Sequence, residues 1–184
     1  MKATGVVRRI DELGRIVIPK EMRRVLNIRE SDSMEIYSGN EGEIILKKYS
    51  PMKELQAFAK KYTDSLAQTT GTIAAVTDRE QIIAVSGGLR GSTGRGISKE
   101  LESAMDNRQF ICADREQEDF IPVFDREDDF KQEIDQEIIS PILCEGDVIG
   151  AVLLLSTENK EALTEAERKL VQTAAAFFGK HMEQ

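Results

Sequence analysis

A chain of 184 residues is long enough to bury one substantial core or two small ones. Its 40% apolar and 32% charged residues are typical of an ordered globular protein and argue against disorder. The longest apolar run, 150–155, is too short to span a bilayer, and the first residues lack the apolar core of a signal peptide. We therefore expect a cytoplasmic protein without membrane contact.

The net charge of −8 conceals a basic beginning. The first 29 residues hold eight basic side chains against three acidic ones, a net charge of +5, so the remainder carries −13. Six of the eight are arginines, whose planar fork suits phosphate and the edge of guanine. This asymmetry favours a surface built for a polyanion, and a nucleic acid is the expected partner.

The first fifty or so residues predict a small β-rich unit. Residues 4–10 and 15–18 show the pattern of two strands joined by a tight turn, with Gly14 free to take a positive φ. Pro19 opens a short amphipathic helix that ends near Asn27. Two more strands are expected, over 34–38 and 43–49. A unit of this size cannot bury enough apolar surface alone, so we expect an obligate, intertwined homodimer here.

The rest of the chain predicts an α+β unit. Ser50 can cap a helix that Pro51 opens and Gly71 ends, and the last helix begins with the capping box Thr164-x-x-Glu167. Between them the expected elements are strands over 72–77 and 81–86, a glycine-rich loop over 87–96, a helix over 97–107, an acidic stretch over 114–137, and a hairpin of strands over 137–143 and 148–155.

The first and last helices of this second unit each carry an apolar stripe. Packed together in an oligomer, the two stripes would form a helical bundle, which together with the intertwined dimer makes a tetramer the expected assembly. The interface residues are predicted to be Leu55, Phe58, Tyr62 and Leu66 on the first helix and Leu170, Ala174, Phe178 and Met182 on the last.

No motif predicts a cofactor or a metal. The glycine-rich loop has Ile97 where a P-loop requires lysine, and favours a flexible surface loop. The run Asp125-x-Glu127-x-Asp129 resembles a calcium loop, but Phe130 replaces its essential glycine. The only histidine, His181, is interpreted as a favourable charge at a helix end, and the two cysteines, Cys112 and Cys144, as ordinary packed thiols.

The N-terminal run G-x-x-R-x-x-D-x-x-G-R-x-x-I-P, followed by a basic helix, resembles the AbrB-type swapped-hairpin transcription factors over residues 2–49. The resemblance implies that two chains interlock their hairpins into one DNA-binding β-barrel, and that the DNA contacts fall on Arg8, Arg15, Arg23 and Arg24. The charge pattern adds Arg9, Lys2 and Lys20 as weaker candidates. The family reads DNA more by shape than by a fixed base code, which implies A·T-leaning, deformable promoter sites.

The full length resembles late-sporulation regulators of this kind, in which a GAF-like α/β domain follows the swapped hairpin. This implies a two-domain α+β protein with residues 1–50 for DNA binding, 51–70 as a linker helix within the helical bundle, and 71–184 as a GAF-like domain for oligomerisation. GAF-like domains commonly sense small molecules, so an effector of unknown chemistry is also open.

Two alternatives stay open. The same N-terminal fold occurs in antitoxins, which would make the chain a partner-binding protein, although antitoxins typically continue into a disordered tail. Some GAF-fold enzymes reduce methionine sulfoxide with cysteine thiols, which would require an activated thiolate at Cys112 or Cys144. Ordinary packing of both cysteines is favoured, and we expect a regulator rather than an enzyme.

Overall fold

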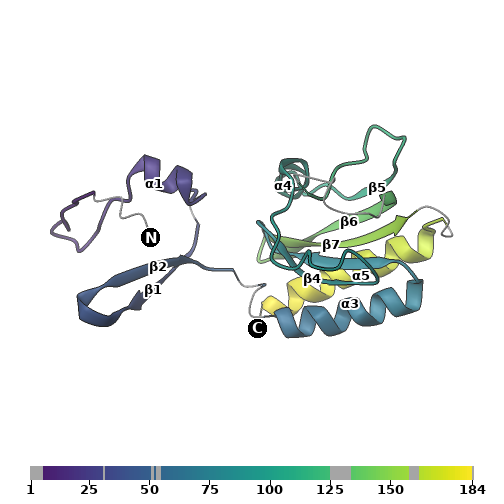
Figure 1. Cartoon of the computed structure of the whole chain (residues 1–184), viewed down its shortest axis with the longest axis horizontal. Coiled ribbons are helices and arrows are strands. Elements are labelled where there is room, and N and C mark those ends of the chain that lie inside the picture. Colours follow the sequence, from purple (N-terminus) through teal and green to yellow (C-terminus); the bar gives the residue numbers. More distant parts are fainter. Residues whose placement is uncertain are drawn as a thin grey trace. The chain divides into compact units, whose positions relative to one another are not determined.

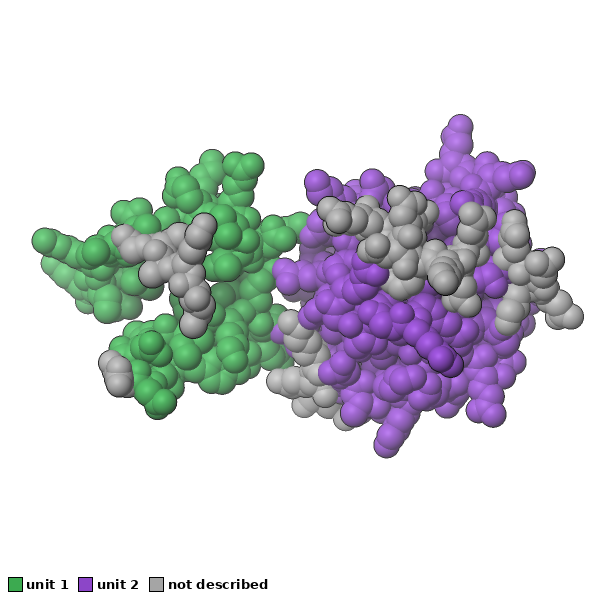
Figure 2. Space-filling model, viewed as in Figure 1, with its two compact units in different colours: residues 1–49 green, residues 50–184 purple. Residues whose placement is uncertain are grey.

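The computed structural model describes residues 6–30, 32–50, 52, 55–124, 134–157 and 162–183. The chain divides into two compact units, Met1–Tyr49 and Ser50–Gln184 (Figure 2). Lys2 and the calcium-like run 125–129 lie outside the described residues. Among the described residues, no helix has both the length and the apolar character needed to traverse a bilayer.

Unit 1, residues 1–49, contains a short helix and a two-stranded hairpin among its described residues. Its elements are α1 (Lys20–Val25), β1 (Met34–Ser38), a 3-10 turn η1 (Asn40–Gly42) and β2 (Ile44–Lys48). Strands β1 and β2 pair antiparallel, with Met34 opposite Lys48 and Ser38 opposite Ile44. Helix α1 follows Pro19, whose carbonyl accepts a hydrogen bond from the N–H of Arg23 at 3.0 Å. The helix and the β1–β2 hairpin follow the predicted pattern.

The two strands predicted over 4–10 and 15–18 are not formed in the described residues 6–18. The turn between them is present, with Gly14 at a φ of 74° and the N–H of Asp11 bonded to the carbonyl of Arg15 at 3.0 Å. A strand needs a neighbour for its backbone groups, and no described segment of the same chain forms a ladder with residues 6–10 or 15–18. The flanking residues are left extended.

Unit 2, residues 50–184, is a five-stranded antiparallel sheet with helices on both faces (Figure 1). The strand order is β4-β3-β7-β6-β5. The elements are α3 (Gln56–Thr70), β3 (Ile73–Thr77), β4 (Ile82–Ser86), α4 (Lys99–Asp106), β5 (Ile111–Asp114), β6 (Ile134–Cys144), β7 (Asp147–Thr157) and α5 (Glu165–Met182).

Each face of this sheet has its own core. Helices α3 and α5 lie side by side on one face and bury Leu66, Val171 and Phe178 against strand residues such as Val152 (Figure 1). On the other face α4 and the loops around it bury Leu101, Met105 and others. Strands β3 and β7 lie between two cores, and β3 is accordingly buried along its whole length.

The helix ends of unit 2 follow from local chemistry. Gly71 ends α3 in the left-handed region at a φ of 68°. Thr164 and Glu167 form the predicted capping box at the start of α5. Ser50, predicted to cap a helix, instead donates its hydroxyl to Asp78 Oδ2 at 2.8 Å. Asp78 is 5% exposed, and its Oδ1 accepts the N–H groups of Glu80 and Gln81 in the β3–β4 turn.

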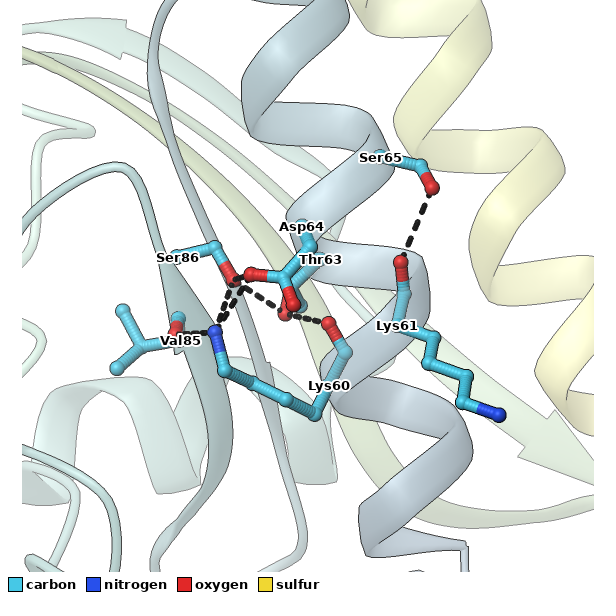
Figure 3. A network of polar contacts seen from close by, with 7 residues as sticks. All are labelled: Lys60, Lys61, Thr63, Asp64, Ser65, Val85 and Ser86. Atoms are coloured by element: carbon cyan, nitrogen blue, oxygen red, sulfur yellow. Dashed lines mark hydrogen bonds and ion pairs between the residues drawn. The ribbon is translucent and has the colours of Figure 1, made fainter.

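A polar network fastens α3 to β4, an edge strand of the sheet (Figure 3). Lys60 Nζ lies 2.6 Å from Asp64 Oδ1 and also donates to Ser86 Oγ at 2.9 Å and to the carbonyl of Val85 at 3.2 Å. Thr63 and Ser86 share a hydrogen bond of 2.9 Å between their hydroxyls. One turn earlier on α3, Gln56 Nε2 donates to the carbonyl of Ile83 at 3.3 Å.

The glycine-rich loop 87–96, predicted to be a flexible surface loop, is packed onto β4. Leu89 is buried, the N–H of Ile82 donates to the carbonyl of Arg95, and the N–H of Gly94 donates to the carbonyl of Ile82. The side chain of Ser92 is fully buried inside this loop. The loop therefore adds to the core instead of standing free.

Candidate nucleic-acid interface

The turn over residues 11–14 of unit 1 presents one arginine, Arg15, in a defined position. Asp11 Oδ1 accepts the backbone N–H groups of Leu13 at 3.0 Å and of Arg15 at 2.8 Å, which closes the turn. Its other oxygen, Oδ2, accepts Arg15 Nε at 2.9 Å. These hydrogen bonds, with the backbone N–H of Arg15 the largest contribution, hold the pKa of the Asp11 carboxyl below its usual range.

The remaining basic candidates stand on the extended segment and on α1. Arg8 and Arg9 are exposed on the strand-like stretch before the turn. Lys20 and Arg24 are exposed on α1, while Arg23 is half-buried. Arg23 Nη1 lies 4.0 Å from Glu30 Oε1, and Arg23 Nε is buried without a hydrogen-bond partner among the described residues. The six described candidates are thus all in unit 1, and Lys2 lies outside the described residues.

Large apolar side chains on the same unit are exposed. Val7 is 90% exposed and Val17 74%, and Ile10, Leu13 and Ile16 are also on the surface. On the β1–β2 hairpin, Ile36 and Ile44 are each exposed by more than two thirds. Exposing this many large apolar side chains to water is unfavourable, and a unit this small buries little apolar surface to offset the cost. The unit therefore lacks part of its core in a single chain.

The predicted interface residues of unit 2 divide into two groups. Leu66, Ala174 and Phe178 are buried in the chain's own core, and the rings of Phe58 and Tyr62 pack edge-on against Phe178 with centroid distances of 5.6 and 5.3 Å. The stripes of α3 and α5 therefore meet within one chain. Leu55 and Met182 are half-buried, and Leu170 is exposed.

Two aromatic residues on α5 escaped the sequence-based prediction. Phe177 is 46% exposed, and His181 stacks on Phe58 with a centroid distance of 5.3 Å and an interplanar angle of 17°. Together with Leu170 they recur at intervals of seven and four residues, so they share one side of the helix. This spacing could have identified the exposed side of α5 from the sequence. The many other apolar residues of the helix made it hard to distinguish.

The two cysteines do not form a reactive pair. Cys112 lies opposite Ile138 in the β5–β6 ladder, whereas Cys144 ends β6 six residues further on. That separation corresponds to about 20 Å along the strand. Burial, followed by the charges of Glu145, Glu183 and Asp147, raises the pKa of Cys144 and disfavours its thiolate. The described residues also contain no group of three or more potential metal ligands.

The comparisons with known proteins match two successive parts of the chain, which meet at residue 54. The family profile described as Stage V sporulation protein T C-terminal, transcription factor, matches residues 54–183. The profile described as Antidote-toxin recognition MazE, bacterial antitoxin, matches residues 7–54. Stage V sporulation protein T of Bacillus subtilis is 44% identical over the full length of both chains. The transition state regulatory protein AbrB of the same organism is 48% identical over 84 residues, which is 45% of this chain and 86% of that protein.

Unit 2 is also similar to solved structures. The GAF domain of a phosphoenolpyruvate-protein phosphotransferase from Coxiella burnetii covers 68% of this chain and 80% of its own, with 16% identity and a TM-score of 0.56. At this identity the likeness shows a shared fold. An AbrB-like N-terminal unit followed by a GAF fold defines a two-unit transcription regulator.

The full-length match and the family profile allow a narrower statement. The chain belongs to the stage V sporulation protein T family of sporulation transcription factors. The predicted family resemblance and the two-domain fold are thereby confirmed.

Proposed function

We propose that the protein regulates late sporulation genes by binding promoter DNA through unit 1 of two interlocked chains. Arg8, Arg15, Arg23 and Arg24 are the proposed DNA contacts, and Arg9, Lys2 and Lys20 add to the attraction. The observation that carries the proposal is the coincidence of exposed arginines and exposed apolar residues on one segment, 7–17. A second chain would cover the apolar residues and leave the arginines facing outward.

The half-buried Arg23 supports this proposal. Its Nε is buried and without a hydrogen-bond partner among the described residues, a condition that costs free energy. Because Nε is buried within the single chain, it gains an acceptor only if the surrounding residues rearrange when a partner chain or DNA binds. The proposed sites are A·T-leaning and deformable, because arginines spread over a hairpin and a helix of two chains contact mainly phosphates and a bent groove.

The test is a salt titration of binding to an A·T-rich promoter fragment. Each phosphate contact contributes about −0.9 to the slope of log K against log salt. We expect Arg23→Ala/Arg24→Ala to make the slope shallower by up to about 3 to 4, since two chains would lose four contacts. The matched control is Lys61→Ala/Lys169→Ala, which removes two exposed charges from unit 2. Equal slopes for parent and Arg variant would contradict the proposal.

For unit 2 we propose association into a tetramer through the exposed side of α3 and α5, with a small effector as a second role. A GAF fold and two exposed apolar residues on α5 support it. A thermal-shift screen with nucleotides and amino acids tests the second role. No shift with any of them would leave association as the function of the unit.

The antitoxin hypothesis keeps one supporting observation, the match of residues 7–54 to an antitoxin profile. Unit 2 is a folded domain with two cores, unlike a toxin-binding tail that folds on its partner. If the parent protein fails to bind promoter DNA, co-purification with a small protein partner becomes the decisive experiment.

A further inference from the structure

The turn over residues 11–14, in the segment proposed to bind DNA, carries two carboxylates, Asp11 and Glu12, beside basic residues. Asp11 is net unfavourable for DNA affinity, because its negative charge opposes the phosphates. Yet its two oxygens make three hydrogen bonds, all to the turn that it closes and to Arg15. Asp11 is therefore an exposed charge that also organises the turn.

The contact between Asp11 and Arg15 uses only one donor of the guanidinium. Asp11 Oδ2 accepts Arg15 Nε at 2.9 Å, and Arg15 has no other ion pair among the described residues. The Arg15 side chain is 70% exposed. The four N–H groups on its two Nη atoms thus stay available for a bidentate hydrogen-bond contact.

An arginine anchored at Nε loses less side-chain entropy when it binds than a free one. The anchor also restricts the directions in which the fork can reach. Phosphates lie along the whole duplex and accept an arginine from many directions, whereas a base edge or a narrow groove accepts it from few. Orientation therefore favours discrimination between sequences more than affinity for DNA in general.

We propose that Asp11 is a positioning residue that aims Arg15 into a groove of the promoter DNA, and so exchanges some general affinity for sequence discrimination. The inference rests on the proposed DNA-binding function. It adds a role for an acidic residue that makes no DNA contact itself.

The experiment compares two variants that each remove one negative charge from adjacent positions, Asp11→Asn and Glu12→Gln. Asparagine keeps a side-chain oxygen for the turn N–H groups and loses the ionic contact with Nε. For each full-length protein, dissociation constants are measured on the promoter fragment and on random-sequence DNA at one salt concentration.

We expect Asp11→Asn to lower the ratio of specific to random binding roughly five- to tenfold, the lower part of the range for one bidentate base contact. Binding to random DNA should stay equal or become tighter. Glu12→Gln should tighten both equally and leave the ratio unchanged. In an Arg15→Ala background, Asp11→Asn should no longer change the ratio.

An equal ratio for Asp11→Asn and the parent, or an Asp11→Asn effect that persists without Arg15, would overturn the inference. If Asp11→Asn does not fold, Arg15→Lys provides the second test, because lysine keeps the charge but lacks the fork. It should lower the ratio while the salt slope stays constant, and an unchanged ratio would overturn the inference. Failure of the parent to bind promoter DNA would instead contradict the proposed function itself.

Discussion

At Gly179 the backbone of α5 lies directly on strand β6. A Cβ at this position would lie 2.0 Å from the carbonyl oxygen of Leu143, which no real contact allows. Gly150 is in the same situation against Thr77 on β3. Both glycines are needed because two backbones approach closely, and neither is needed for a turn.

Gly179→Ala should therefore destabilise unit 2 by about 2–3 kcal/mol, since the helix must move off the sheet to admit one methyl group. Urea unfolding followed by circular dichroism measures the free energy. Gly96→Ala is the matched control, because its Cβ would meet nothing closer than 3.7 Å. Similar midpoints for the two variants would show that α5 adjusts without cost.

Residue-scale prediction succeeded where spacing alone decides and failed where packing decides. The capping pair Thr164 and Glu167 was predicted from its three-residue interval. Phe178 was predicted as an interface residue, yet it is fully buried in the chain's own core, while its neighbour Phe177 is exposed. On a helix with a broad apolar face, the boundary between buried and exposed is set by the opposing elements, which the sequence does not display.

At the scale of elements, the start of α5 links stability to pH. The Thr164 hydroxyl and backbone N–H hold the pKa of Glu167 below its ordinary value of 4.5. A carboxyl whose pKa is lowered by folding stabilises the folded state above its ordinary pKa, and this contribution is lost as pH falls through the folded value. The capping box should therefore weaken below about pH 4.5.

Thr164→Ala should lower the free energy of unfolding by about 1 kcal/mol at pH 7 and by less at pH 3. Urea titrations at both pH values provide the comparison. Asp11 and Asp64 also have lowered pKa values, so the parent loses stability in acid for several reasons. The informative quantity is the difference in unfolding free energy between parent and variant. If this difference is the same at both pH values, the contribution of the cap does not depend on the ionisation of Glu167.

Alternating apolar residues identify a candidate strand, but a strand exists only where a neighbour completes its hydrogen bonds. The pairs β1–β2, β3–β4 and β6–β7 were all predicted, because each partner follows closely in sequence. The segments 4–10 and 15–18 were predicted as strands and are unpaired where the single chain is described. β5 was missed, because its four residues run into an acidic stretch; among the described strands it pairs with β6.

At the scale of the whole molecule, the proposed tetramer can be tested with the two exposed apolar residues of α5. Leu170→Asp/Phe177→Asp places two charges on the exposed side of α5, where the parent residues are 38% and 46% exposed. We expect light scattering to show a tetramer for the parent and a dimer for the variant, because burying the charges in an interface is costly.

Gln172→Asp/Lys169→Asp, also on exposed positions of α5, is the control and should remain a tetramer. A parent protein that is already a dimer would contradict the proposed bundle. The dimeric variant should still bind promoter DNA, because unit 1 is unaltered. Loss of DNA binding together with the tetramer would instead make association a requirement for binding.

The general plan of the molecule was predictable because charge and composition change along the chain. The net charge is +5 over the first 29 residues and −13 over the rest, which predicts that the basic end binds a polyanion. The family resemblance was also predictable, since it depends on a contiguous motif. The ion pair of Asp11 with Arg15 was not, because only the folded turn brings the two side chains together.

The attachment of α3 to β4 also affects how readily the sheet could aggregate at high protein concentration. Side chains one helical turn apart, Gln56 and Lys60, bond to carbonyls two residues apart on the outermost strand, at Ile83 and Val85. A strand from another molecule that added to this edge would need these two carbonyl oxygens as acceptors. Both already accept side-chain hydrogen bonds, and the charged Lys60 ammonium lies at the same edge. Helix α3 therefore protects the β4 edge against fibril growth, in addition to any contribution that it makes to the core.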